Sequence, residues 1–177
     1  MQLKLLILFF LLSFAACNDA QVQGSKNAKA KSTTTIYLVR HAEKADGENP
    51  PLTELGKKRA NDLADLLADK GITDIYSTDY LRTQQTAAPT AQKVSRGVGS
   101  YSPNNLNELA DKIRKQQGVV LVVGHSNTTP ELVKILGGDP GTPINEAYEY
   151  DRLYELKLNK GKVISSNILQ YGAVTER

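Results

Sequence analysis

The chain has 177 residues, of which 40% are hydrophobic and 23% charged, with 13 glycines, 7 prolines, two histidines and a single cysteine. This length and composition suit one α/β-sized globular domain with a sizeable core, and they exclude a disulfide scaffold and a collagen-like or low-complexity chain. The formal charge of +3 is too small to indicate a nucleic-acid partner, and it would not repel an anionic substrate.

The N-terminus has the pattern of a bacterial export signal. Lys4 precedes an apolar run over residues 5–14 that is too short for a comfortable membrane span, and small residues follow it. Residues 13–17 (Ser-Phe-Ala-Ala-Cys) resemble a lipobox, the motif whose cysteine becomes the lipid-modified first residue. We therefore predict a lipoprotein signal peptide over residues 1–16 and lipidation of Cys17. Ordinary secretion, with an incidental cysteine near the cleavage site, is the alternative.

The next segment, residues 17–32, is polar and has almost no large apolar side chain, so it cannot bury enough surface to order itself. A flexible chain of this length reaches about 20 Å, which suits a tether between a lipid anchor and a domain. A disordered terminus without an anchor fits the same composition. The predicted organisation is a signal peptide, a lipidated Cys17 with its tether, and one domain over residues 33–177. The protein would be an exported lipoprotein of the cell envelope, at the periplasmic face or in the outer membrane.

From residue 33 onward, strand-like and helix-like patterns alternate. Apolar, β-branched or alternating runs predict strands over residues 34–39, 72–76, 119–123, 152–158 and 163–169. Apolar residues at helical spacing, with capping residues and terminal glycines, predict helices over residues 53–70, 80–92, 102–117 and 129–136, with Ser102-Pro103 and Thr129-Pro130 opening the last two. Pro89 is expected to kink the second helix or to end it early.

The apolar run over residues 119–123 is continuous, so both of its faces must be covered, as in a central parallel strand. The last two strands flank the turn Asn159-Lys160-Gly161 and are expected to form an antiparallel hairpin. The predicted fold is therefore α/β: a three-layer α/β/α sandwich around a mixed, mostly parallel sheet, without an internal repeat or a second domain.

Both histidines directly follow apolar strands. His41 comes after the first strand of the domain, and His125 follows the continuous apolar run. Ligands of open α/β sheets bind at the carboxyl ends of strands, so we expect both imidazoles at one functional edge. Arg40 precedes His41, and Arg82 opens the helix after the second strand. These four side chains predict an anion pocket, because guanidinium groups are always charged and bind phosphate in a bidentate manner.

Arg40 and His41 impose a geometric condition on this site. Successive side chains of an extended strand point to opposite faces, so the strand must bend at Arg40 if both are to reach one ligand. The helix opened by Thr129-Pro130 begins just after His125, and its free N–H groups and dipole would add to the anion field. Residues 127–130 and 149–152 are expected to shape the pocket and its rim.

Four motifs resemble those of the histidine phosphatase superfamily, also called the phosphoglycerate mutase-like family. They are residues 39–44 (Val-Arg-His-Ala-Glu-Lys, with Ala42 where glycine is usual), 52–60 (Leu-Thr-Glu-Leu-Gly-Lys-Lys-Arg-Ala), 77–87 (Ser-Thr-Asp-Tyr-Leu-Arg-Thr-Gln-Gln-Thr-Ala) and 123–126 (Val-Gly-His-Ser). The motifs occur in the family's order, and the resemblance covers about residues 33–169. The compact size resembles the branch of small phosphohistidine-protein phosphatases, which implies a phosphoglycerate mutase-like fold.

The resemblance implies a phosphatase that needs neither a metal nor another cofactor and hydrolyses phosphomonoesters or phosphohistidine. His41 would be the nucleophile that forms a phosphohistidine, with its other ring nitrogen donating to a backbone carbonyl. The flanking arginines would disfavour protonation of His41. Arg40, Arg82 and His125 would hold the phosphoryl oxygens and stabilise their charge in the transition state. The implied partners are a small phosphorylated substrate or a phosphoprotein, and the membrane through the N-terminal lipid.

The leaving alkoxide needs a proton from a carboxylic acid. Glu108, in the segment Leu106-Asn107-Glu108, matches a Leu-x-Glu segment of many family members, although the predicted helix turns Leu106 inward and leaves Glu108 toward solvent. Asp46 and Glu48, in the loop after His41, are rival candidates. Without an acid, substrates with good leaving groups are favoured, such as phosphohistidine or an acyl phosphate.

Other classes of function fit the sequence less well. A non-catalytic lipoprotein that binds phosphorylated ligands would keep the arginines, but it would not need His41. A two-histidine metal site requires a third ligand, and Arg40 beside His41 opposes a cation. Residues 137–141 are rich in glycine, but they follow a predicted helix rather than a strand and lack the lysine of a nucleotide-binding loop.

Overall fold

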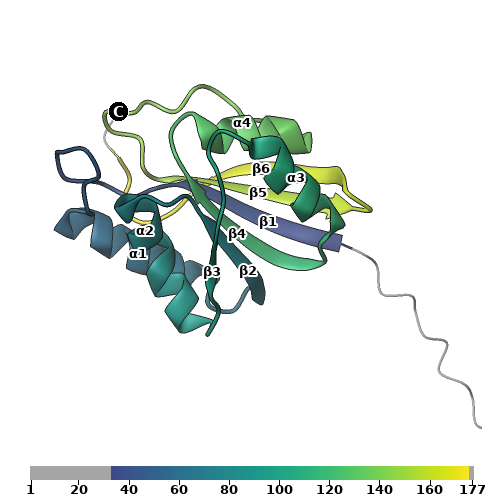
Figure 1. Ribbon diagram of the computed structural model, residues 1–177, viewed down its shortest axis with the longest axis horizontal. Helices are drawn as coiled ribbons and strands as arrows, with labels where there is room; N and C mark the ends of the chain where they lie inside the picture. The colour runs from purple at the N-terminus through teal and green to yellow at the C-terminus, as the bar shows by residue number, and fades with distance from the viewer. Residues whose placement is uncertain (1–32, 176–177) are drawn as a thin grey trace, which may run out of the picture. The chain divides into compact units, whose positions relative to one another are not determined.

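The computed structural model describes residues 33–175, which form a six-stranded sheet with helices on both faces (Figure 1). In chain order the elements are β1 (Thr33–Arg40), α1 (Glu54–Leu67), β2 (Ile72–Ser77), α2 (Leu81–Lys93), β3 (Val98–Ser100), α3 (Leu106–Lys115), β4 (Gly118–Gly124), α4 (Thr128–Leu136), β5 (Arg152–Asn159) and β6 (Lys162–Gln170). The strands lie in the order β3-β2-β4-β1-β5-β6. The predicted signal peptide, Cys17 and the tether fall outside the described residues.

The sheet is mixed and mostly parallel, as predicted. β1 runs parallel to β4, β4 to β2, and β2 to β3, whereas β5 is antiparallel to both β1 and β6. Parallel neighbours need crossover connections, and the helices supply them. The carboxyl ends of β1, β2 and β4 therefore meet at one edge of the sheet, which is where ligands bind in open α/β folds.

Successive side chains of β1 point to opposite faces of the sheet, and each face has its own apolar cluster. Ile36 and Leu38 pack in one apolar cluster with residues of α3 and α4, while Tyr37 and Val39 pack in another with residues of α1 and α2. Figure 1 shows the two pairs of helices on opposite faces. Each fully buried leucine or isoleucine contributes about 1.5–3 kcal/mol relative to an exposed one. This double coverage fixes the position of the residues that follow β1.

The predicted start of the third helix is wrong. The helix expected to open at Ser102-Pro103 begins at Leu106 instead, and residues 103–104 form a turn. Asn105 is the N-cap, because its side-chain oxygen accepts a hydrogen bond from the Glu108 N–H. A proline after a serine is a good opening for a helix, but here the amide side chain of Asn105 provides the cap one turn later.

Pro89 does not end α2 early, because the helix continues to Lys93. Ala87, Thr90 and Ala91 lie on its buried face, and their packing carries the helix through the proline. No helix within residues 33–175 has both the length and the apolar character required to cross a membrane.

Candidate active site

The two histidines lie at the ends of adjacent parallel strands. Arg40, the last residue of β1, pairs with Gly124, the last residue of β4, and the His41 N–H donates to the Gly124 carbonyl at 2.9 Å. The centres of the His41 and His125 rings are 5.6 Å apart, and their planes are inclined at 68°. The structure thus brings together the two imidazoles that the sequence analysis assigns to one edge.

His41 is held by its own backbone. The residue is 2% exposed, and its Nδ1 lies 2.8 Å from the Ala42 carbonyl oxygen. A carbonyl oxygen only accepts hydrogen bonds, so Nδ1 carries the proton and Nε2 carries the lone pair. Burial, aided by the positive charges of Arg40 and Arg82, lowers the pKa of His41 to about 3. The ring is therefore neutral at pH 7.

His125 is held by other side chains. Its Nδ1 lies 3.4 Å from Arg82 Nη2, and its Nε2 lies 3.0 Å from Thr78 Oγ1. Because a guanidinium nitrogen only donates, Nδ1 accepts from Arg82, and Nε2 donates to the threonine hydroxyl. Burial, together with the charges of Arg82 and Arg40, lowers the pKa of His125 to about 4. This ring is therefore neutral as well.

A cavity of about 270 Å³ lies over both rings. It is lined by His41, Lys44, Arg82, His125, Ser126, Asn127 and Glu146. Two cationic side chains and two neutral imidazoles face a single carboxylate, a balance of charge that favours an anionic ligand. Within residues 33–175, no three histidine, cysteine, aspartate or glutamate side chains are grouped to hold a metal ion.

Arg82 reaches the cavity from the first turn of α2. The Tyr80 ring supports it, with Arg82 Cζ 4.4 Å from the ring centre, and the same ring meets His125 edge-on at 5.1 Å. Arg82 Nε is buried and has no hydrogen-bond partner among the described residues. Buried donors are nearly always paired in proteins, and an anion in the cavity is a suitable partner for this one.

Arg40 does not line the cavity that the imidazoles share. Its Nη1 and Nη2 donate to backbone carbonyls of the loop over residues 145–149, at 2.8–3.3 Å, and its Cζ lies 4.1 Å from the centre of the Tyr150 ring. Its Nε is buried without a partner among residues 33–175. β1 ends at Arg40, where the sequence analysis requires a change of direction. Contact between Arg40 and a phosphoryl oxygen stays a prediction, for which Nε is the available donor.

The motif that contains Arg82 also fixes the loop after His41. Thr86 Oγ1 accepts a hydrogen bond from the Ala42 N–H at 3.0 Å. Gln85 Oε1 accepts from the N–H of Leu52, at the far end of the same loop, at 2.7 Å. Both side chains hold the backbone of the loop that follows His41. Both residues belong to the 77–87 motif, and nothing in the sequence alone predicts this role for them.

Gly56 lets α1 approach the same loop. A Cβ at this position would lie 2.1 Å from the Glu43 carbonyl oxygen, so no other residue fits without moving the backbone. Gly124 has a similar part on the other strand, because a Cβ there would lie 2.8 Å from Thr129 Oγ1 and from Tyr101 Oη. These two glycines permit the close packing that positions the two histidine loops.

The first turn of α4 adjoins the cavity. α4 begins at Thr128, one residue before the predicted start, with Asn127 as its N-cap, and the Thr128 hydroxyl accepts from the His125 N–H at 3.0 Å. Asn127 and Ser126 both line the cavity. The positive end of the helix dipole therefore lies beside the anion pocket. In the second predicted rim segment, residues 149–152, the centre of the Tyr150 ring lies 6.2 Å from the centre of the His41 ring.

The carboxylates near the site occupy different places. Glu108 accepts a hydrogen bond from the Asn105 side chain at 2.9 Å and lines a separate cavity of about 660 Å³. Asp46 and Glu48 are exposed in the loop after His41 and do not line the cavity of the imidazoles. Glu146 does line it. The sequence does not predict Glu146 at the site, because this residue lies in an irregular segment whose path follows from no local pattern.

The family comparison covers the first part of the domain. Residues 36–110 match the family model described as Histidine phosphatase superfamily (branch 1). This match spans less than half of the chain, so it is a similarity to the superfamily over that segment. A curated relative, the Probable phosphoglycerate mutase GpmB of Yersinia pestis (strain Pestoides F), is 43% identical over 60 residues, which cover 29% of this chain and 28% of that protein. The chain thus matches less than a third of that relative's length.

Two solved structures share the fold. The protein histidine phosphatase SixA complexed with tungstate has a TM-score of 0.64 and 17% identity, over 77% of this chain and 96% of that chain. Phosphoglycerate mutase from Bacillus anthracis str. Sterne has a TM-score of 0.61 and 16% identity, over 79% of this chain and 93% of that chain. At these identities the likeness shows the fold alone, which is α/β and phosphoglycerate mutase-like.

Proposed function

We propose that the chain is a phosphatase that hydrolyses phosphomonoesters or phosphohistidine through a covalent phosphohistidine on His41. The state of the His41 ring carries this proposal. Its Nδ1 is bound to the Ala42 carbonyl, so the neutral ring keeps a lone pair on Nε2 and lines the cavity with Arg82 and His125. The match to the superfamily and the fold shared with SixA support the same reading.

The proposed reaction has two steps. In the first, His41 Nε2 attacks phosphorus, a P–N bond forms, and the bond from phosphorus to the leaving group breaks. In the second, water attacks the phosphohistidine, the P–N bond breaks, and inorganic phosphate leaves as His41 regains its lone pair. The Nδ1–H bond to Ala42 keeps the ring oriented through both steps.

The cations around the cavity stabilise the charge that builds on the phosphoryl oxygens. Arg82 offers its buried Nε, which has no partner among residues 33–175, and Lys44 lines the same cavity. Once a phosphoryl group is bound, its negative charge favours protonation of His125 at Nδ1. Arg82 Nη2, which donates to that nitrogen in the structure, then donates to a phosphoryl oxygen instead, and so does His125 Nδ1. All of these charges are supplied by the chain itself.

Glu146 is the first candidate for the acid that protonates an alkoxide leaving group. Its side chain lines the cavity of the imidazoles, whereas Glu108 lines the neighbouring cavity and is engaged with Asn105. A general acid must reach the leaving oxygen directly or through one water, and Glu146 meets that condition more directly.

The export signal and the lipobox support a further part of the proposal, that the protein is a cell-envelope lipoprotein anchored through Cys17. Its substrate would then be a phosphorylated small molecule or protein outside the cytoplasm. Membrane fractionation of cells that express the wild type or Cys17→Ala tests this. We expect the wild type in the membrane fraction and the variant in the soluble fraction.

Turnover of p-nitrophenyl phosphate and of a phosphomonoester panel, in the presence of a chelator, tests the proposed activity. We expect turnover that vanadate inhibits and a trapped phosphoryl label on His41 that is labile in acid and stable in base. A label stable in acid would point to a serine or threonine ester. Binding of phosphate or tungstate without any turnover would instead support a non-catalytic protein that binds phosphorylated ligands.

A further inference from the structure

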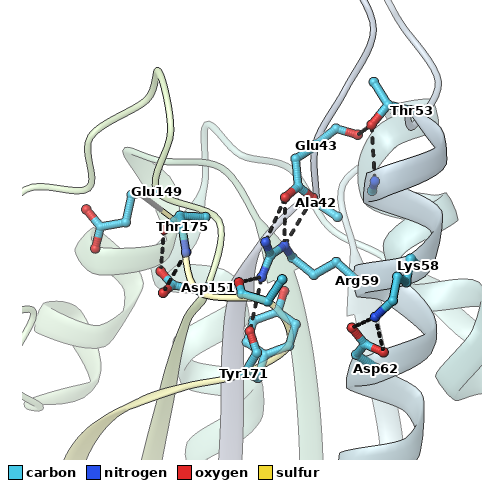
Figure 2. A network of polar contacts seen from close by, with 12 residues as sticks. Ala42, Glu43, Thr53, Lys58, Arg59, Asp62, Glu149, Asp151, Tyr171 and Thr175 are labelled. Carbon is cyan, nitrogen blue, oxygen red and sulfur yellow. Dashed lines mark hydrogen bonds and ion pairs between the residues drawn. The ribbon is translucent and has the colours of Figure 1, made fainter. Parts of the chain in front are cut away.

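Arg59 of α1 is a buried guanidinium that the mechanism above does not use. The residue is 2% exposed, and its Nε and Nη2 donate to both carboxylate oxygens of Glu43 at 2.7–3.0 Å. Its Nη1 donates to the carbonyls of Tyr171 and Ala173, at 3.1 and 2.8 Å. One side chain thus joins the loop after His41 to residues 171–175, here called the C-terminal segment (Figure 2).

Glu43 belongs to the peptide group that holds the nucleophile. The carbonyl that accepts from His41 Nδ1 lies in the peptide between Ala42 and Glu43. The Glu43 carbonyl accepts from the Thr53 N–H at 2.9 Å, and its side chain is bound by Arg59. With both the backbone and the side chain of Glu43 held, this peptide cannot rotate freely. The direction of the hydrogen bond that orients the His41 ring is therefore fixed as well.

The C-terminal segment also reaches a second side of the site. The Tyr171 N–H donates to the Asp151 carbonyl at 2.9 Å, and Thr175 donates to the Asp151 carboxylate through its N–H and its hydroxyl, as Figure 2 shows. Asp151 directly follows Tyr150, whose ring packs on Arg40 and lies 6.2 Å from the His41 ring. One short segment thus braces residues on two sides of the nucleophile.

We propose that Arg59 is a positioning residue for His41, acting through Glu43 on the Ala42 carbonyl that orients the ring. The inference rests on the proposed function, in which His41 Nε2 must point at phosphorus. A displacement of about 1 Å at a reacting group lowers a rate by about 100-fold, so a small rotation of this peptide is costly to turnover. A purely structural ion pair would change stability without changing the state of the His41 ring.

Two conservative variants of the full chain test this inference. Arg59→Lys keeps the positive charge but loses the planar fork that binds a carboxylate and two carbonyls at once. Glu43→Gln keeps the shape of the side chain and loses its charge, and it carries the test if Arg59→Lys does not fold. Lys58→Ala is the matched control, because it breaks an exposed pair with Asp62 on the same helix (Figure 2).

Nitrogen NMR of ¹⁵N-histidine-labelled protein reports on the ring directly, since the chain has only two histidines. With circular dichroism showing that each variant is folded, we expect the protonated Nδ1 signal of His41 to shift in Arg59→Lys and Glu43→Gln and to stay unchanged in Lys58→Ala. In steady-state assays we expect kcat to fall by about 10- to 100-fold in the first two variants, with little change in KM.

An unchanged Nδ1 signal in both variants would overturn the inference. The NMR measurement needs no turnover, so it separates this inference from the proposed function. If the wild type hydrolyses no phosphomonoester, the proposed function fails, and the His41 signal still decides whether Arg59 orients the ring.

Discussion

The two histidines occupy equivalent positions at the ends of neighbouring parallel strands, yet the fold holds them in different ways. His41 is anchored to a main-chain carbonyl through Nδ1, and no described residue bonds its Nε2. His125 is anchored by side chains, with Thr78 at one nitrogen and Arg82 at the other. A main-chain anchor gives a fixed direction and leaves one nitrogen for chemistry. Side-chain anchors can exchange partners, which suits a residue that responds to a bound charge.

Removing His41, the proposed nucleophile, should have the largest effect. We expect His41→Ala to lower kcat for p-nitrophenyl phosphate by about 10⁴-fold or more, because the remaining imidazole, His125, has both ring nitrogens engaged by Thr78 and Arg82. Arg82 and His125 remain, so tungstate should still bind in a calorimetric titration. Substantial residual turnover would place the nucleophile elsewhere, and the proposed difference in role between His41 and His125 would fail.

Removing the other histidine should have a smaller effect of a different kind. We expect His125→Ala to lower kcat by about 10²- to 10³-fold, because one stabilising contact to the phosphoryl oxygens is lost while the nucleophile remains. Quenching in base after brief reaction should still recover a phosphoryl label on His41. If the two histidine variants lose activity equally and neither forms the label, the division of roles is wrong.

The two candidate acids, Glu146 and Glu108, line different cavities, so replacing each of them tests which cavity supplies the proton. We expect Glu146→Gln to lower kcat for alkyl phosphomonoesters by about 100-fold and to change p-nitrophenyl phosphate turnover little, since that leaving group needs no proton. Glu108→Gln is the matched change in the other cavity and should alter neither rate appreciably. The reverse pattern would restore Glu108 as the proton donor.

The smallest expected effect concerns stability and pH. Burial holds the pKa of His41 near 3 in the folded chain, against an ordinary value of 6.5. As pH falls below 6.5 the unfolded chain takes up this proton first, so the folded state loses stability progressively down to about pH 3. At about 1.4 kcal/mol per pH unit, His41 should cost about 2 kcal/mol at pH 5 relative to pH 8.

Urea unfolding of the wild type and of His41→Asn at pH 8 and pH 5 measures how much of the loss of stability is due to His41. The asparagine variant should lose about 2 kcal/mol less stability on acidification than the wild type. His125, whose pKa is lowered to about 4, acts in the same direction and remains in both proteins. Equal losses in the two proteins would show that the His41 ring is not buried in its neutral form.

Much of the fold followed from local pattern. The strand over residues 119–123 is apolar at every position, which requires cover on both faces, and the structure places it between two other parallel strands. The alternation in 152–158 predicted a strand in the terminal hairpin, which is present. The start of α3 was missed because the choice between two capping residues, Ser102 and Asn105, depends on packing rather than on the local sequence.

The site followed from the sequence only in part. His41, Arg82 and His125 were found because they stand at strand ends or at a helix start, where a topology rule applies to any open α/β sheet. Tyr150, in the predicted rim segment 149–152, does lie beside His41. Glu146 comes from the irregular stretch between α4 and β5, and no periodicity predicts where such a stretch runs. The use of Arg40 as a clamp for backbone carbonyls was likewise unforeseen, because those carbonyls lie more than 100 residues away.

By itself the amino-acid sequence determined the class of fold and the edge of the sheet at which His41, Arg82 and His125 gather, because periodicity and strand-end placement are local properties. Only the tertiary structure decided which nitrogen of His41 is bound to the Ala42 carbonyl, which carboxylate shares its cavity, and how Arg59 connects the loop after His41 to the C-terminal segment. Those features arise from hydrogen bonds between segments distant in the chain, and such bonds exist only once the two faces of the sheet are packed.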